Sequence, residues 1–264
     1  MNRFNLKGKV AIITGGAGLL GRHHAAALIE INARVILIDK HQGRLISQKN
    51  YFKKENKNVD IFKTDITKEK NIKKTIGKIK RKYGRIDILI NNAAIDFKPV
   101  AKKSKKNTFE NLSLKKWKQE LEVGLTGAFI CSKLIGAEIA RKRGGVILNI
   151  ASDLSVIAPD QRLYSHLNSI KPATYSVIKH GIVGLTKYLA SYWADKKIRV
   201  NALSPGGVYS GQDKTFVSKI KKLIPLKRMA TVNEYHETIQ FLCSDASSYM
   251  TGHNMIMDGG RSII

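Results

Sequence analysis

The chain has 264 residues, of which 43% are hydrophobic, and this fits one large α/β domain that needs neither disulfide nor metal for stability. Its formal net charge is +27, but the lysines responsible are spread along the chain without interleaved aromatic residues, which disfavours a nucleic-acid platform. Because no apolar run reaches the ~18 residues of a membrane span, we expect a cytoplasmic protein that stays out of the membrane.

Short apolar runs alternate with longer amphipathic stretches almost to the C-terminus. The short runs are continuously apolar, as in Val35–Ile38, which suits strands covered on both faces of a parallel sheet. The alternation predicts a Rossmann-type, doubly wound α/β fold, a single domain with a mainly parallel seven-stranded sheet and helices on both faces. The predicted strands are Val10–Thr14, Arg34–Asp39, Val59–Thr64, Ile86–Asn91, Gly145–Ala151, Arg199–Leu203 and Asn254–Met257. The predicted helices are Leu19–Ile31, Leu45–Glu55, Lys68–Tyr83, Leu114–Arg141, Ala173–Asp195 and Val232–Asp245.

The first predicted strand leads into a glycine-rich turn, Thr14–Gly21, which opens the first predicted helix. Glycines let the backbone turn tightly and approach a pyrophosphate, which the amides and the positive dipole end of the helix attract. The residues expected to bind the cofactor here are Gly15, Gly18, Leu19, Leu20 and Gly21.

The end of the second predicted strand indicates which dinucleotide binds. Asp39 can accept hydrogen bonds from both ribose hydroxyls of NAD and would repel the 2′-phosphate of NADP. Lys40 could pair with that phosphate, so NAD is favoured and NADP is the alternative. In open α/β sheets ligands bind at the carboxyl ends of the strands. The other cofactor contacts expected at these ends are Asp65, Ile66, Asn91 and Ala93.

Beyond the fifth predicted strand, three side chains together suggest hydride-transfer chemistry. Tyr175 and Lys179 are four residues apart on a predicted helix and therefore share one face. A neighbouring ammonium stabilises a phenolate, so such a tyrosine can exchange a proton with an alcohol or carbonyl while hydride moves to or from a nicotinamide. The hydroxyl of Ser152 can hold the same substrate oxygen. No cluster of His, Cys and carboxylate residues suggests a catalytic metal.

The order of these motifs resembles that of the compact, single-domain members of the short-chain dehydrogenase/reductase family. The matching stretches are Thr14–Gly21, Asn91–Ala94, Ser152, Tyr175–Lys179, Arg199–Gly206 and Asp258–Gly260. The resemblance implies that Ser152 orients the substrate oxygen, Tyr175 is the acid/base, and Lys179 binds the nicotinamide ribose and tunes Tyr175.

The same resemblance implies contacts around the nicotinamide and a way of assembling. Pro205, Gly206 and Val208 would lie along the nicotinamide, and Ser210 would reach its carboxamide. A homotetramer or homodimer would form through the two long predicted helices.

A narrower resemblance concerns the substrate. Five stretches are similar to bacterial oxidoreductases of surface-sugar pathways, including the flagellin-modification and legionaminic-acid type, which implies a sugar or sugar phosphate. They are Ile150–Leu154, Ala158–Tyr164, Tyr192–Asp195, Pro205–Asp213 and Ser244–Gly252. Two alternatives stay open: an epimerase or dehydratase that retains its NAD, and a nucleotide-sensing binding protein that has lost catalysis.

The chain departs from the family pattern at three places. Leu19 stands where compact members have a glycine, although three loop glycines remain. Gly124 replaces an asparagine that, in the family, distorts the helix and helps to hold a proton-relaying water; glycine could bend the helix and offer its carbonyl, but not an amide. Ser152 and Tyr175 are about ten residues further apart than usual.

The extra residues before Tyr175 extend a predicted substrate loop near 153–172, and a lid region is predicted near 207–230. Arg162 and Lys171 are the candidates for gripping an anionic group, such as the phosphate of a sugar. The alternative for this segment is a subunit-interface loop. The net positive charge allows three interpretations as well: a lysine-rich surface, attraction of an anionic substrate, and binding of a polyanion.

Overall fold

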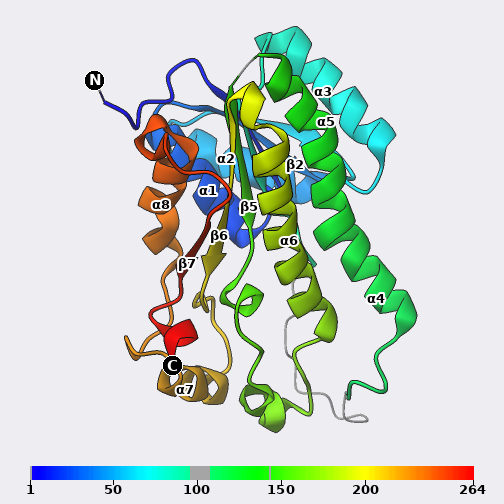
Figure 1. Cartoon of the computed structure of the whole chain (residues 1–264), viewed down its shortest axis with the longest axis vertical. Helices are drawn as coiled ribbons and strands as arrows, with labels where there is room; N and C mark the ends of the chain where they lie inside the picture. Colours follow the sequence, from blue (N-terminus) through cyan, green and yellow to red (C-terminus); the bar gives the residue numbers. More distant parts are fainter. Residues whose placement is uncertain (1, 96–107, 143) are drawn as a thin grey trace.

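The computed structural model describes residues 2–95, 108–142 and 144–264. Its strands form one seven-stranded sheet in the order β3-β2-β1-β4-β5-β6-β7, and every neighbouring pair is parallel (Figure 1). The strands are β1 Val10–Thr14, β2 Arg34–Asp39, β3 Val59–Lys63, β4 Ile88–Asn91, β5 Gly145–Ile150, β6 Ile198–Pro205 and β7 Asn254–Met257. The predicted fold class is confirmed. The strand order reverses between β1 and β4, which is where ligands bind in sheets of this kind.

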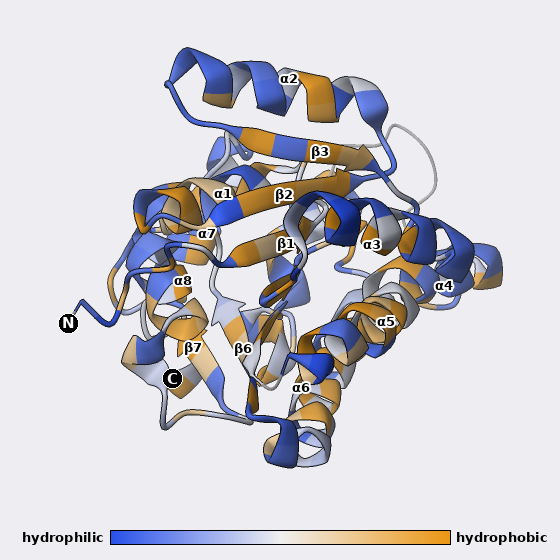
Figure 2. Ribbon diagram, turned by 90° about the horizontal axis from the view of Figure 1, so that it is seen from above, coloured by the Kyte–Doolittle hydropathy of each residue, from blue (hydrophilic) through white to orange (hydrophobic). Residues whose placement is uncertain are grey.

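The helices cover both faces of this sheet, as Figure 2 shows from above. They are α1 Leu19–Glu30, α2 Gln42–Lys54, α3 Glu69–Tyr83, α4 Leu114–Leu121, α5 Gly127–Arg141, α6 Ala173–Tyr192, α7 Lys214–Lys222 and α8 His236–Cys243. Successive strand residues face opposite sides. Ile13 therefore packs in a core with α1, α2 and α8, whereas Ile12 packs in a second core with α3, α5 and α6. Both positions must be apolar, which explains the continuous runs in the sequence.

The stretch predicted as one helix over Leu114–Arg141 is interrupted by a π-helical turn at Glu122–Thr126. By length and mean hydropathy this stretch could span a membrane, but half of its most apolar window is buried in the fold, as in a core helix. Gly124 lies in the π-helical turn and is buried against α6. A Cβ built on Gly124 would lie 2.9 Å from Cγ2 of Ile178, so the close approach of the two helices requires glycine here.

Two helical segments were not predicted, and they pack together beyond the sheet. The extra residues before Tyr175 form a 3-10 helix, Gln161–Leu167, and the predicted lid contains α7. Tyr164 from the first segment contacts the ring of Phe216 from the second, at 5.5 Å between ring centres. Leu163 and Ile220 belong to the same small apolar cluster. The predicted helix Val232–Asp245 is also divided, into 3-10 turns flanking α8.

Candidate active site

The predicted catalytic residues lie near the carboxyl end of β5. Ser152 follows this strand and caps a short 3-10 helix, accepting a hydrogen bond from the amide of Leu154. Tyr175 and Lys179 lie one turn apart on α6, with Nζ of Lys179 5.6 Å from the centre of the tyrosine ring. Nζ of Lys179 donates a hydrogen bond of 2.8 Å to the carbonyl of Ile150, the last residue of β5. This bond ties the helix to the strand end that precedes Ser152.

The ammonium group of Lys179 is nearly enclosed by protein, with the residue only 6% exposed. Burial, with a smaller contribution from the nearby charge of Lys171, lowers the pKa of Lys179 to about 8. Nζ of Lys171 itself lies 3.6 Å from the centre of the Tyr175 ring. Two amines therefore flank the tyrosine, an arrangement that favours negative charge on a phenol oxygen.

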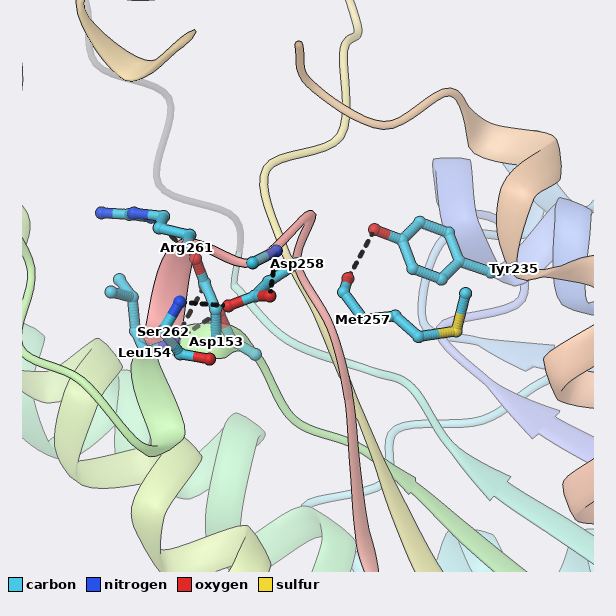
Figure 3. Close-up of polar contacts among 9 residues, drawn as sticks. Asp153, Leu154, Tyr235, Met257, Asp258, Arg261 and Ser262 are labelled. Carbon is cyan, nitrogen blue, oxygen red and sulfur yellow. Dashed lines mark hydrogen bonds and ion pairs between the residues drawn. The ribbon is translucent and has the colours of Figure 1, made fainter. Parts of the chain in front are cut away.

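A series of buried polar contacts connects Ser152 to the C-terminal turn through the ion pair of Asp153 and Arg261. Oγ of Ser152 donates to Oδ1 of Asp153 at 2.8 Å, and Oδ2 of Asp153 lies 2.7 Å from Nη1 of Arg261. Figure 3 shows this turn, in which the carboxylate of Asp258 accepts hydrogen bonds from the amides of Gly260 and Ser262. Sequence reasoning missed Asp153 and Arg261. The position of Asp153 directly after Ser152 was a signal, but its partner is 108 residues away.

Tyr175 and Lys179 line a small cavity between α4 and α6, with Glu120 and Gly124 on its other side. Its volume of about 20 Å³ gives room for one water molecule. Glu120 is buried, and its Oε2 accepts a short hydrogen bond from the hydroxyl of Thr174. Sequence reasoning missed Glu120, because the helical pattern of this stretch does not distinguish a buried glutamate from the surface lysines around it.

The glycine turn forms a cradle of bare backbone at the start of α1. A Cβ on Gly15 would lie 2.8 Å from Cα of Ala93, and one on Gly21 would lie 2.5 Å from the carbonyl oxygen of Gly15. Gly15 also has a φ of 62°, which favours glycine. Asn92, which sequence reasoning did not single out as a contact, holds the turn by donating from Nδ2 to the carbonyls of Thr14 and Gly15. The cradle suits a pyrophosphate at the helix N-terminus, where Gly18 is the N-cap.

The leucine that replaces a family glycine does not fill this cradle. Leu19 is 42% exposed at the first position of α1, and Leu20 beside it is half-buried. The backbone of the turn therefore stays accessible despite the replacement.

Asp39 lies beside the glycine turn, at the end of β2. Its Oδ2 accepts from the amide of Ala17 at 3.3 Å and its Oδ1 from the amide of His41 at 3.0 Å, while the side chain stays partly exposed. The carboxylate is thus fixed at the strand end and can still accept hydrogen bonds from a ribose.

Two other predicted cofactor contacts have roles within the protein. Oδ1 of Asp65 accepts from the amide and the hydroxyl of Thr67, at 3.0 and 2.8 Å, so it organises the turn before α3. The side chain of Ile66 is buried in the core on the side of α3 and α5. Only the backbone of Ile66 could contact a ligand.

The side chain of Asn91 is turned into the core rather than toward the edge of the sheet. Its Nδ2 donates to Oγ of Ser132 at 2.9 Å and to Oδ1 of Asn149 at 2.8 Å. Asn149 donates in turn to Thr186, so the network joins β4 and β5 to α5 and α6. The pattern of two adjacent asparagines did not reveal which of them faces inward.

The residues predicted around the nicotinamide lie where β6 leads toward α7. Pro205 ends β6 and is buried, and the amide of Gly206 donates to the carbonyl of Met257 at 2.8 Å. Val208 pairs with Ala230 across the loop. The predicted carboxamide contact, Ser210, is exposed and donates its amide to Oε1 of Gln212.

The two predicted anion-binding residues have different surroundings. The side chain of Arg162 is 87% exposed, and its guanidinium is held by the carboxylate of Asp160 at 2.8 Å. Lys171, by contrast, lies directly over the ring of Tyr175.

Comparison with known proteins gives matches along almost the whole chain. A family model described as "Enoyl-(Acyl carrier protein) reductase" matches residues 16–262. The NAD-dependent glycerol dehydrogenase of Listeria innocua is 35% identical over 98% of this chain and 96% of its own length. The D-threitol dehydrogenase of Mycolicibacterium smegmatis is 30% identical over 98% and 95%. A crystal structure of a gluconate 5-dehydrogenase from Burkholderia cenocepacia, in complex with NADP and tartrate, has a TM-score of 0.85 at 25% identity and covers 100% of this chain and 98% of its own.

Proposed function

The chain belongs to the short-chain dehydrogenase/reductase family of oxidoreductases, and from that premise we propose that it oxidises a hydroxyl group of a small polyol or sugar with NAD. The observation that carries this proposal is the hydrogen bond by which Lys179, one turn after Tyr175 on α6, is tied to the end of β5 just before Ser152. Relatives named for glycerol and D-threitol support the substrate class.

The bare cradle at the start of α1 and the carboxylate of Asp39 fit a dinucleotide, NAD in preference to NADP. The chemistry that NAD supplies when bound is acceptance of a hydride from the substrate carbon. The proposed cofactor-binding residues are Gly15, Gly18, Leu19, Leu20, Gly21, Asp39, Asp65, Ile66, Asn91, Ala93, Tyr175, Lys179, Pro205, Gly206, Val208 and Ser210. Ile66 and Asn91 would contribute backbone atoms, because their side chains are turned into the core. The geometry adds Asn92 as the residue that holds the turn.

The proposed roles of the catalytic residues follow from their charges. Ser152 holds the substrate hydroxyl, and Tyr175 takes its proton as the hydride leaves. The amines of Lys179 and Lys171 favour the charged form of the phenol that accepts this proton. Asp153 accepts a hydrogen bond from Ser152 and, paired with Arg261, keeps that hydroxyl in place.

We place the substrate between the loop near 153–172 and the lid near 207–230. Lys171 is the better candidate for an anionic group, because Arg162 is already paired with Asp160. An acidic or phosphorylated sugar of surface-glycan biosynthesis is the narrower proposal. The gluconate 5-dehydrogenase of similar structure is in complex with tartrate, a small polyhydroxy anion.

We also propose that the protein assembles as a homodimer or homotetramer through α5 and α6. These helices expose large apolar side chains: Phe129, Val177, Tyr188 and Tyr192. The exposed rings of Tyr188 and Tyr192 stack on each other, with 5.9 Å between ring centres. Exposed apolar area of this kind typically marks an interface.

The test is incubation with NAD and a panel of glycerol, threitol, gluconate and sugar phosphates, followed by NADH absorbance and product analysis. Net NADH formation with oxidation of a panel member is the expected result. Conversion of a sugar without net NADH would favour an epimerase or dehydratase instead. Cofactor binding without turnover of any compound would favour a nucleotide-sensing protein.

A further inference from the structure

A buried acidic residue, Glu120, lines the same small cavity as Tyr175 and Lys179. The residue is 8% exposed, and acidic side chains are seldom buried to this extent unless they are paired. One of its oxygens is fixed by the hydroxyl of Thr174, on α6. The other lies 3.7 Å from Nζ of Lys116, whose side chain is half-exposed one turn earlier on α4. Glu120 thus reaches from the cavity toward the surface.

The proposed reaction creates a need for a proton path. The proton that Tyr175 takes from a substrate hydroxyl must leave before the next turnover. Lys179 beside it is buried, and its ammonium donates to the carbonyl of Ile150. The cavity that these two residues line has room for one water molecule, and Glu120 forms its opposite wall.

Gly124 leaves this cavity open. It contributes only backbone to the wall, and the π-helical turn around it places that backbone against Ile178. Of the described residues that line the cavity from α4 and the π-helical turn, Glu120 is therefore the one with a titratable side chain.

We propose that Glu120 is the outer group of a proton relay that runs from Tyr175 and Lys179, through one water in the cavity, to the surface near Lys116. The inference rests on the proposed dehydrogenase function. In the oxidation, the substrate O–H bond breaks and its proton passes to the oxygen of Tyr175. The C–H bond breaks with its electron pair, which reduces NAD, and the carbonyl double bond forms. The relay then carries the proton through the water to the carboxylate of Glu120 and on to solvent. Glu120 acts through the water and touches neither substrate nor cofactor.

The decisive variant is Glu120→Gln, which keeps the size of the side chain and an oxygen that can accept from Thr174 but cannot take up a proton. We expect kcat to fall at least tenfold, toward the ~10²-fold that loss of proton-transfer help typically causes, while NAD affinity and Tm stay unchanged. Added formate, a small carboxylate, should restore part of the rate in proportion to its concentration. Formate should not rescue Tyr175→Phe, in which the acid/base itself is missing.

The matched control is Glu122→Gln, because Glu122 is exposed two residues further along the same helical stretch and should behave as wild type. A crystal structure should show one water between Glu120 and Lys179. Unchanged kcat in Glu120→Gln, or a loss that comes with lowered Tm and no formate rescue, would overturn the relay while leaving the dehydrogenase function intact. An inactive wild type would overturn both.

If Glu120→Gln does not fold, Glu120→Asp takes its place. The shorter carboxylate should slow turnover, and formate should restore it. A loss without rescue would overturn the relay in this variant too.

Discussion

The buried ammonium of Lys179 should destabilise the folded protein, and Lys179→Met should reveal by how much. The pKa of Lys179 falls from 10.5 to about 8, mainly through burial. At about 1.4 kcal/mol for each pH unit, this difference corresponds to roughly 3 kcal/mol at neutral pH. Methionine forfeits the hydrogen bond to the carbonyl of Ile150, which is worth about 1 kcal/mol. We therefore expect the variant without cofactor to be more stable than wild type by about 2 kcal/mol at neutral pH, although inactive.

The pH dependence gives the sign of this effect. Below pH 8 the lysine is protonated in both folded and unfolded chains, so the full destabilisation is present. Between 8 and 10.5 the unfolded chain holds a proton that the folded chain has lost, so wild-type stability rises relative to the variant. Urea unfolding of both proteins at neutral and alkaline pH measures this gap, with Lys187→Met, an exposed position on α6, as the control. A variant less stable than wild type at neutral pH, or a gap that does not narrow as pH rises, would refute the reasoning.

Three further substitutions test other parts of the account. Gly124→Asn should destabilise the fold by about 1–3 kcal/mol, because its Cβ would crowd Ile178, and Ile178→Ala in the same chain should recover part of the lost Tm; an unaltered Tm in the single variant would contradict the packing argument. Asp39→Ala should narrow the ratio of kcat/KM for NAD over NADP, since it removes the ribose acceptor and the charge that repels the phosphate; a wild type that prefers NADP would show this interpretation to be wrong. Lys171→Ala should raise KM for an acidic polyol more than Arg162→Ala does, because the arginine is held by Asp160; the reverse order would move the anion site to the outer loop.

The fold could be predicted because both faces of the sheet are buried. Alternate residues of β1 enter different cores, so the whole strand had to be apolar and the pattern was visible in the sequence. The glycine turn and the four-residue spacing of Tyr175 and Lys179 are likewise local patterns. Each lies in a segment that follows a predicted strand, so the sequence could place both near the carboxyl edge of the sheet.

Local patterns of this kind could not predict contacts between segments that are distant in the sequence. Asp153 pairs with Arg261 across 108 residues, and Glu120 meets Thr174 across 54. The π-helical turn around Gly124 depends on how closely α6 approaches, which the helical period does not encode. The surroundings of Arg162 were likewise not visible in the sequence: its guanidinium is paired with the carboxylate of Asp160, two residues away.

The most direct test of the central claim is the turnover of Tyr175→Phe beside wild type, with NAD and the best substrate of the polyol panel. The variant lacks only the hydroxyl that exchanges the proton, so kcat should fall by ~10²–10⁴ while NAD affinity, measured by fluorescence titration, stays close to wild type. Turnover within a few-fold of wild type would contradict the assignment of Tyr175 as the acid/base, and with it the mechanism proposed for this site.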